Sequence, residues 1–299
     1  MPTNITGSDL SQRLRERLEF IEFRLYWEGS INRNDLRDRF GISMPQATLD
    51  LKEYQVLAPD NLVYDVTKRH YSSSSFFTPK LSPPSPHEYL SRLEDQIAGK
   101  EPLALSSPPA TAFIPSFTRS VNPEVLRAVL SAFRQKKRIE IVYQSPKSPE
   151  STSRWVYPLV MVHALNRWHV RTFCHLRNGF RSFVLGRIVK ITGCKDETDA
   201  IPKDEHWESI VNVVFTPSLQ LTTNAAKIIE QDYNMVNGTV IVKVRRALLE
   251  YFLLENLLLK SKTAEPGENA PIRKDNGQVV IQNVKAVQNE LQTLRKAPL

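Results

Sequence analysis

Residues 43–64 read SMPQATLDLKEYQVLAPDNLVY, and this stretch decides the fold of the first part of the chain. Ser43 can cap a helix because its hydroxyl oxygen can accept an N–H group of the first turn, where Pro45 is tolerated. We expect this helix to run to about Tyr54. At about 100° per residue, one apolar arc of the helix should face a core, and it consists of Ala47, Leu51 and Tyr54.

A β-hairpin is expected directly after this helix. Its first strand is predicted at Val56-Leu57-Ala58 and its second at Leu62-Val63-Tyr64, with a turn between them. Upstream, apolar residues at helical spacing predict one helix over residues 14–25, and a second short helix is expected over residues 34–40. Two helices, a tight glycine turn, a third helix and a hairpin form the order of a winged helix-turn-helix.

The third helix carries residues suited to reading DNA. Recognition helices contact base edges through their N-terminal turns. Gln46 can pair with adenine, and the apolar groups of Thr48 and Leu49 can contact thymine methyl groups. The predicted DNA contacts are Ser43, Pro45, Gln46, Thr48, Leu49 and Lys52 on the helix, and Lys68, Arg69 and His70 in the wing. The alternative is a winged helix that binds protein.

The excess positive charge lies in one central block. The net charge is +8, from 40 Lys and Arg against 32 Asp and Glu. Residues 119–195 hold 15 basic and 3 acidic residues, a balance of +12, whereas residues 1–78, 79–118 and 196–299 come to −1, −1 and −2. Such a block predicts a polyanionic partner such as a nucleotide or a nucleic acid. The alternative is a basic face that only keeps the protein soluble.

The composition excludes several classes of protein. With 41% hydrophobic and 24% charged residues in 299, the chain is neither collagenous nor disordered, and its two cysteines, Cys174 and Cys194, build no disulfide scaffold. The N-terminus has no basic-then-apolar leader, and the longest apolar stretch, residues 247–259, is too short to cross a bilayer. We therefore expect a cytoplasmic protein that does not contact a membrane.

Composition shifts predict four parts of an α+β multidomain chain. They are a winged helix-turn-helix over residues 1–78, a Ser/Pro-rich linker with a helix between His87 and Ile97 over residues 79–118, a third part over residues 119–205 and a fourth over residues 206–299. The third part starts with a helix at Pro123 and continues in short strands typical of a small barrel. In the fourth, residues 247–260 predict a helix that is apolar on nearly every face and is expected to be buried in a dimer.

An anion site is expected within the central block. Alternation along residues 168–174 places His169 and Arg171 on one face of a strand. Together with Arg181, Tyr143 and Ser145 on neighbouring strands, they would converge on one barrel face, where guanidinium and hydroxyl groups suit phosphate oxygens. The alternative leaves the arginines solvated on an outer face while the aromatic residues fill the barrel.

The stretches IEIVYQS (139–145), RWVYPLV (154–160) and NRWHVRTFCHLRNGFRSFVLGRI (166–188) resemble a WYL domain. The triplet that names the family falls at Trp168-His169-Val170, so two of its three letters differ, whereas the Phe-x-Leu-x-Arg-Ile ending is kept from Phe183 to Ile188. With SMPQATLDLKEY and NLVYD before it, the chain resembles repressors encoded beside bacterial anti-phage systems of the BREX and CBASS types.

This resemblance implies an Sm-like WYL β-barrel and a C-terminal α+β dimerisation domain. It further implies a homodimeric transcription factor whose WYL domain senses a ligand. The positions that match the ligand pocket of the family are Tyr143, Ser145, His169, Arg171 and Arg181.

Two functions remain open from the sequence. One is a homodimeric, sequence-specific repressor of a phage-defence operon and of its own gene, which binds an inverted-repeat operator and is released by a nucleotide or single-stranded nucleic acid. The other is an adaptor that binds nucleic acid without sequence preference through the basic barrel.

An enzyme, a cofactor and a metal site are not expected. The sequence has no phosphate loop, no GxSxG motif and no paired histidines at metal spacing, and the central block has almost no carboxylates. Cys174 and His175 are strand neighbours that should point to opposite faces, and Asp204-Glu205-His206 is expected to form a solvated loop.

Overall fold

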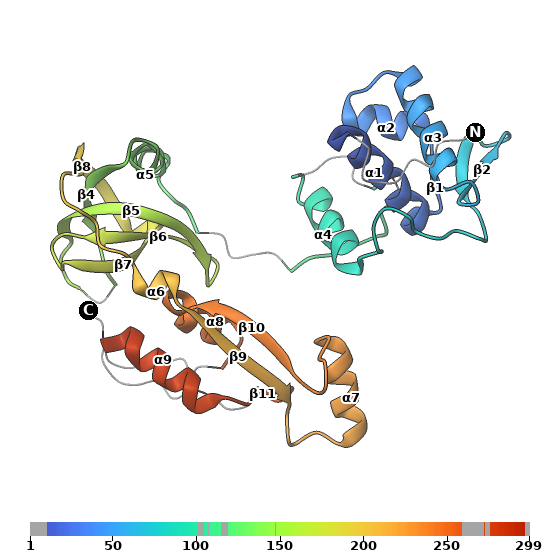
Figure 1. Cartoon of the computed structure of the whole chain (residues 1–299). Helices are drawn as coiled ribbons and strands as arrows, with labels where there is room; N and C mark the ends of the chain where they lie inside the picture. The colour runs from blue at the N-terminus through green and yellow to red at the C-terminus, as the bar shows by residue number, and fades with distance from the viewer. Residues whose placement is uncertain are drawn as a thin grey trace. The chain divides into compact units, whose positions relative to one another are not determined.

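The computed structural model describes residues 11–100, 105–106, 108–114, 119–146, 148–258, 272 and 276–296. The chain divides into two compact units, residues 1–114 and 115–299 (Figure 1). The first unit combines helices with one small sheet, and the second contains two further sheets. Among the described helices, none combines the length and the apolar character needed to cross a membrane.

The first unit contains the predicted three-helix arrangement. Its elements are α1 (Gln12–Glu28), β1 (Ser30–Ile31), α2 (Arg33–Phe40), α3 (Met44–Leu57), β2 (Leu62–Asp65) and β3 (His70–Ser73). Gly29 and Gly41 end α1 and α2 in the left-handed region, with φ of 72° and 64°, as glycine allows. The three strands form an antiparallel sheet in the order β1-β3-β2.

The core of this unit lies between the three helices. The predicted apolar arc of α3 is confirmed, because Ala47, Leu51 and Tyr54 are fully buried. They pack against the buried stripe of α1, which includes Leu18 and Ile21. The arc opposite the core is therefore the free face of α3.

The hairpin prediction for residues 56–64 is wrong in its first strand. Val56 and Leu57 belong to the last turn of α3, and Ala58 is its C-terminal cap. The helix continues until Pro59 stops it, because a proline cannot extend a helix and forces an extended conformation on the residue before it. The hairpin instead joins β2 to β3, so its tip lies at residues 66–69.

The predicted helix between His87 and Ile97 forms as α4 (Pro86–Ile97). It packs against α1 through a small cluster in which Leu93 and Leu105 are buried and Phe23 and Tyr89 are partly buried. The rings of Phe23 and Tyr89 stack with centroids 6.1 Å apart. Part of the Ser/Pro-rich segment is therefore attached to the winged helix.

The second unit begins with a helix and five antiparallel strands. They are α5 (Pro123–Gln135), β4 (Lys137–Tyr143), β5 (Thr152–Ala164), β6 (Arg167–Cys174), β7 (Gly179–Val184) and β8 (Ile188–Asp196), with a 3₁₀ turn η1 (Leu185–Arg187) before β8. The strand order is β7-β6-β5-β4-β8, so the last strand pairs with the first, as in the predicted barrel. Helix α5 packs on β4, β5 and β8 at one end of the sheet (Figure 1).

Strand β5 runs through Pro158 without a break. A register shift between Pro158 and Val160 bends it against β6. The core of this domain combines residues of α5 and of the strands and includes Val129, Ile141 and Val170. The bend is what lets a single long strand contribute to both ends of the barrel.

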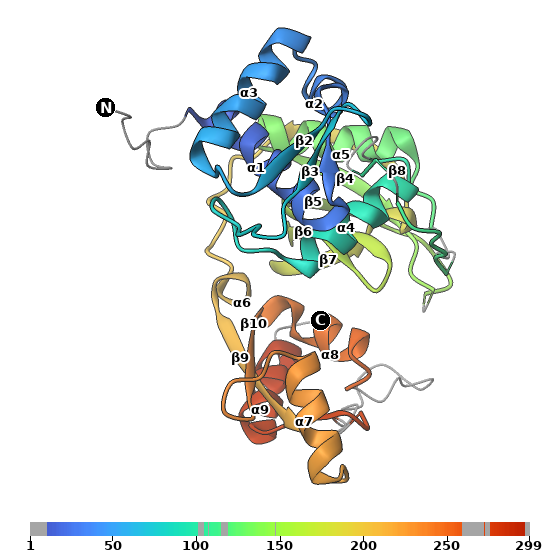
Figure 2. The same cartoon turned by 90° about the vertical axis from the view of Figure 1, so that its right-hand side faces the viewer.

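The C-terminal part is α+β, as predicted. Its elements are α6 (Glu205–Glu208), β9 (Ile210–Pro217), α7 (Thr223–Asp232), β10 (Val240–Arg245), the 3₁₀ turn η2 (Arg246–Leu248), α8 (Leu249–Glu255), β11 (Val279–Ile281) and α9 (Val284–Lys296). The sheet order is β10-β9-β11, and α7 and α9 pack against β9 (Figure 2). Strand β11 and helix α9 were not predicted from the sequence.

The apolar helix predicted over residues 247–260 is shorter in the structure. It consists of η2 and α8, and its predicted end at Lys260 lies outside the described residues. Leu249 and Leu253 are fully buried in the core of their own domain, whereas Leu257 is 66% exposed. Intramolecular packing therefore accounts for the buried side of this helix.

Candidate nucleic-acid interface and anion site

The N-terminal half of α3 presents most of the predicted DNA contacts on its free face. The Ser43 hydroxyl caps the helix by accepting the N–H of Gln46 at 3.3 Å. Pro45 and Lys52 are exposed, and Leu49 is 58% exposed. Thr48 is half-buried and its hydroxyl donates to the carbonyl of Met44 at 3.0 Å, which leaves its methyl group as the part free to contact a base.

Gln46 is held by a buried carboxylate. Its Nε2 donates to Oδ1 of Asp50 at 2.9 Å, and Asp50 in turn accepts two hydrogen bonds from Arg17 of α1, at 2.7 and 3.1 Å. The Asp50 side chain is 1% exposed. One N–H and the carbonyl oxygen of the Gln46 amide remain for a base. Asp50 and Arg17 could not be recognised from the sequence, because their pairing joins residues 33 positions apart.

A second buried network fixes the other end of α3. The Glu22 carboxylate, buried on α1, accepts the hydroxyl of Tyr54 at 3.0 Å and three backbone N–H groups of residues 80–82. The Tyr54 hydroxyl also accepts Nδ2 of Asn61 at 2.9 Å. Burial, with Glu22 nearby, raises the pKa of Tyr54 far above its ordinary value, so the hydroxyl stays protonated and donates. The orientation of α3 is thus tied to α1 and to the segment after the wing.

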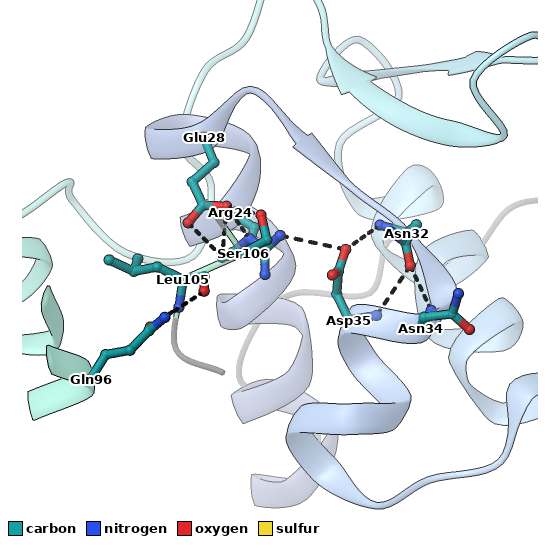
Figure 3. Close-up of polar contacts among 8 residues, drawn as sticks. All are labelled: Arg24, Glu28, Asn32, Asn34, Asp35, Gln96, Leu105 and Ser106. Carbon is teal, nitrogen blue, oxygen red and sulfur yellow. Dashed lines mark hydrogen bonds and ion pairs between the residues drawn. The ribbon is translucent and has the colours of Figure 1, made fainter. Parts of the chain in front are cut away.

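A third network links α1 to α2 and to the chain beyond α4 (Figure 3). Asn32 and Asp35 form a reciprocal capping box at the start of α2. The nearly buried Arg24 joins Asp35 to Glu28, with its Nε 2.8 Å from Oε2 of Glu28. Glu28 also accepts the hydroxyl and the N–H of Ser106. The segment that leaves the first unit is therefore anchored to the helix that orients the helix-turn-helix.

Gln96 completes this anchor. Its side-chain amide forms two hydrogen bonds with the backbone of Leu105, of 2.7 and 2.9 Å (Figure 3). The Gln96 amide thus bonds to both the N–H and the carbonyl of Leu105, as the backbone of a neighbouring strand would.

The tip of the wing carries the predicted basic residues. Lys68 and Arg69 are exposed there, and Arg69 adopts a left-handed φ of 55°. The Asp65 carboxylate closes the turn by accepting the N–H groups of Thr67 and Lys68, and these bonds lower its pKa. His70 is half-buried and its ring contacts the Ser72 hydroxyl at 3.0 Å, so two of the three predicted wing residues are fully available to phosphates.

In the WYL-like domain, the five predicted pocket residues do not share one face. Residues paired across antiparallel strands lie on the same side of a sheet. Arg171 pairs with Ser182, whereas Arg181 pairs with the neighbour of Arg171, Thr172. Arg171 and Arg181 therefore lie on opposite sides of the sheet, and the expected convergence of all five residues is wrong. Alternation along one strand cannot give the register of the next.

Arg171 is already paired. Its guanidinium forms two hydrogen bonds with the carboxylate of Asp204, one of them 2.8 Å long, and the two side chains are only 6% and 10% exposed. Asp204 also caps α6 by accepting the N–H of Trp207. The expectation of a solvated loop at residues 204–206 is therefore wrong, since Asp204 fastens β6 to the start of the C-terminal domain.

His169 is buried on the same face as Arg171. Its ring lies 5.1 Å from that of Tyr251 on α8, and it is 3% exposed. Burial, together with the nearby charges of Arg167 and Arg187, lowers its pKa. Tyr143 and Ser145 are half-buried, and Ser145 lines a cavity of about 370 Å³ together with Arg187. Arg187 is a basic residue that the predicted pocket did not include.

Part of the excess charge of the central block is neutralised just beyond its end. Arg138 forms ion pairs with Glu197 and Asp199, at 3.2 and 2.8 Å, and His175 contacts Glu197 at 2.8 Å. One ring nitrogen of His175 and one carboxylate oxygen each of Glu197 and Asp199 lie within 4.8 Å of one another, a spacing that would suit a metal ion. Arg138 supplies the positive charge for both carboxylates, so the ion-pair network explains this cluster.

Family models match three stretches of the chain. Residues 13–95 match the BrxR transcriptional regulator winged helix-turn-helix domain, residues 124–192 match the WYL domain, and residues 210–287 match the BrxR transcriptional regulator C-terminal dimerization domain.

Full-length relatives extend this similarity over most of the chain. A DNA-binding transcriptional repressor CapW from Pseudomonas aeruginosa is 41% identical over 80% of this chain and 81% of its own. The CapW repressor of Escherichia coli strain KTE188 is 36% identical over 90% of this chain and 94% of its own. That of Stenotrophomonas maltophilia is 33% identical over 94% and 95%. A solved structure of PafBC from Arthrobacter aurescens aligns with 99% of this chain and 51% of its own at 18% identity, but its TM-score of 0.25 is too low to indicate a shared arrangement.

Proposed function

Since this chain belongs to the family of CapW DNA-binding transcriptional repressors, which are not enzymes, we propose that it represses a phage-defence operon and its own gene by binding an inverted-repeat operator. The C-terminal dimerisation domain makes two copies of the winged helix part of one molecule. A two-fold dimer presents two identical reading helices, so each half of the operator is read by one copy. A protein that binds operators acts where the chromosome lies, and we therefore place it in the cytoplasm.

The observation that carries this proposal is the fixed orientation of an exposed reading face on α3. Leu49 is 58% exposed opposite the core, while the buried carboxylates of Asp50 and Glu22 hold the helix from behind. An exposed leucine on this face of the helix suits contact with thymine methyl groups in a major groove. Rigid support of this kind favours sequence-specific reading, because a helix that is already ordered loses little conformational entropy when it binds.

We further propose that an anionic ligand at the WYL domain changes the separation of the two winged helices and so releases the operator. A ligand can shift such an equilibrium only if it binds one arrangement better than the other. Arg187 supports this step, since it places positive charge in the wall of a cavity that Ser145 also lines.

The experiment that tests sequence reading compares Gln46→Ala with wild type on the operator and on a scrambled duplex. We expect Gln46→Ala to lose about 1–3 kcal/mol of binding free energy on the operator and nothing on the scrambled duplex, because a base-reading contact is removed. Arg134→Gln is the matched control: Arg134 is exposed near the end of α5 and has no part in the reading face.

The same duplexes test two-fold symmetry. Inserting about five base pairs between the half-sites turns one of them to the other side of the helix, and we expect this to abolish tight binding. Tight binding that survives both the insertion and Gln46→Ala would favour the adaptor, which holds nucleic acid by phosphate contacts of the basic barrel alone.

A further inference from the structure

Three arginines outside the predicted pocket line one cavity at the end of the five-stranded sheet where β6 begins. The cavity has a volume of about 350 Å³, and its walls include Arg119, Arg167 and Arg187. Arg119 precedes α5, Arg167 is the first residue of β6, and Arg187 is the last residue of η1. Three separate segments of the chain thus each supply one guanidinium group.

These guanidinium groups have no counter-charge among the described residues. None of the three forms an ion pair there, and Nε of Arg167 is buried without a hydrogen-bond partner. Arg138 and Arg171 of the same domain differ, since carboxylates neutralise both. Three like charges around one cavity repel each other unless an anion lies between them.

The electrostatics of the neighbouring groups agree with this. Burial, with the charges of Arg119 and Arg187, lowers the pKa of Arg167. Burial, with the charges of Arg167 and Arg187, also lowers the pKa of His169. Burial and the positive field therefore both disfavour a proton on these two groups.

The backbone brings the three segments together closely. A Cβ atom added to Gly186 would lie 2.7 Å from the carbonyl oxygen of Ser120, so the segment that carries Arg119 passes directly over η1. A side chain at position 186 would have to displace that segment. Gly186 is therefore a positioning residue for Arg119.

Trp168 lies in the wall of the same cavity and is 49% exposed. One part of its indole contacts the ring of His163, with centroids 4.9 Å apart. An exposed aromatic ring beside a cluster of arginines is an arrangement that binds nucleotides, because the ring stacks on a base while guanidinium groups bind the phosphate.

From this geometry we propose that the cavity binds a nucleoside phosphate, with Arg119, Arg167 and Arg187 around the phosphate and the adjoining base stacked on Trp168. This inference rests on the proposed function, in which an anionic ligand releases the operator, and it assigns that ligand a cavity outside the predicted pocket and the residues that contact it. A free nucleotide and the end of a single-stranded oligonucleotide share this chemistry.

Binding is measured on the full-length protein at physiological salt with three probes: thymidine 5′-monophosphate, a 5′-phosphorylated hexathymidylate and inorganic phosphate. Arg119→Gln, Arg167→Gln and Arg187→Gln should each weaken binding of the first two probes about tenfold or more, since each removes a charge-assisted contact. Arg134→Gln removes the same charge from an exposed position of α5 and should change the Kd by less than about twofold. Preference for the hexathymidylate over the mononucleotide would identify an oligonucleotide as the ligand, and the reverse would identify a free nucleotide.

Two further variants separate the parts of the site. Trp168→Leu should weaken binding of both thymidine probes and leave inorganic phosphate unchanged, because it removes only the stacking surface. Gly186→Ala keeps every charge but displaces the Arg119 segment, and it should weaken all three probes. The thermal midpoint of each variant is measured alongside. Arg119 is exposed, so Arg119→Gln should fold even if Arg167→Gln does not.

The proposed site is wrong if the three arginine variants bind the thymidine probes as tightly as wild type, or if Arg134→Gln loses as much as they do. Operator release by the same probes is scored separately. If equal probe concentrations release wild type and the arginine variants from the operator, the repressor mechanism stands and this site is wrong. If the arginine variants lose probe binding but no probe releases wild type from the operator, the site stands and the release step is wrong.

Discussion

The guanidinium of Arg171 and the carboxylate of Asp204 form a nearly buried ion pair, with Nη2 2.8 Å from Oδ1 and a second hydrogen bond beside it. Arg171 pairs in register with Ser182 on β7, and Asp204 caps α6, so the pair connects the WYL domain to the first turn of the C-terminal part. An arginine that the sequence assigned to ligand binding thus has a structural role.

Arg171→Ala should destabilise the second unit by about 3–5 kcal/mol, because the Asp204 carboxylate would remain in a nearly buried place without its partner. Denaturant unfolding followed by tryptophan fluorescence measures this. The double variant Arg171→Ala/Asp204→Ala is the control and should recover part of the loss. An Arg171→Ala protein as stable as wild type would contradict the structural role.

Asp50→Ala should lower both stability and operator affinity. It leaves Arg17 unpaired behind α3 and frees the Gln46 amide, and we expect a loss of about 3 kcal/mol in the free energy of unfolding. Gln46→Ala is the comparison: it should weaken operator binding but cost less stability than Asp50→Ala, because Arg17 still pairs with the Asp50 carboxylate. Equal stability of Asp50→Ala and wild type would mean that the pair does not support the reading helix.

Lys68→Gln/Arg69→Gln should weaken binding to operator and scrambled duplex alike, because wing residues of this kind contact phosphates. The slope of log K against log[salt] should fall by about 2 in magnitude, roughly one for each phosphate that the wing no longer binds. Lys100→Gln, which changes an exposed lysine beyond the end of α4, serves as the control. A loss confined to the operator would instead make the wing a base-reading element.

His169 should titrate below the ordinary range of histidine, because burial and the charges of Arg167 and Arg187 lower its pKa. The unfolded chain binds this proton more readily, so this group makes stability fall as the pH drops below the ordinary pKa of histidine, about 6.5, towards the folded value. Ring proton shifts in NMR spectra measure the folded pKa directly. Arg187→Gln should raise it, and an unchanged value would show that Arg187 does not act on the imidazole.

The local signals of the sequence predicted the helices of the winged helix well. Ser43, Gly29 and Gly41 act within one turn of their own position, and the apolar arc of α3 depends on spacing alone. The hairpin prediction failed because the β-branched Val56 is typical of a strand, while the helix in fact continues to the proline.

The networks behind the reading face could not be predicted, because their partners are distant in sequence. Glu22 accepts N–H groups 58 to 60 residues away, and Arg171 meets a carboxylate 33 residues further along, outside the basic block. Charge counting along the sequence could not tell that Arg138 and Arg171 are neutralised by carboxylates. Two features of the structure distinguish Arg171 from the arginines that line the cavity at Arg187. They are the strand register and the approach of residues 119–121 to Gly186.

The measurement that tests the repressor function most directly is a gel shift of the full-length protein at physiological salt. It uses DNA from upstream of the protein's own gene and a scrambled duplex of equal length. The proposed function predicts a preference for the upstream DNA of at least about 10³-fold. Equal binding to both duplexes, with a steep dependence on salt, would contradict it and show that the basic block only holds phosphates.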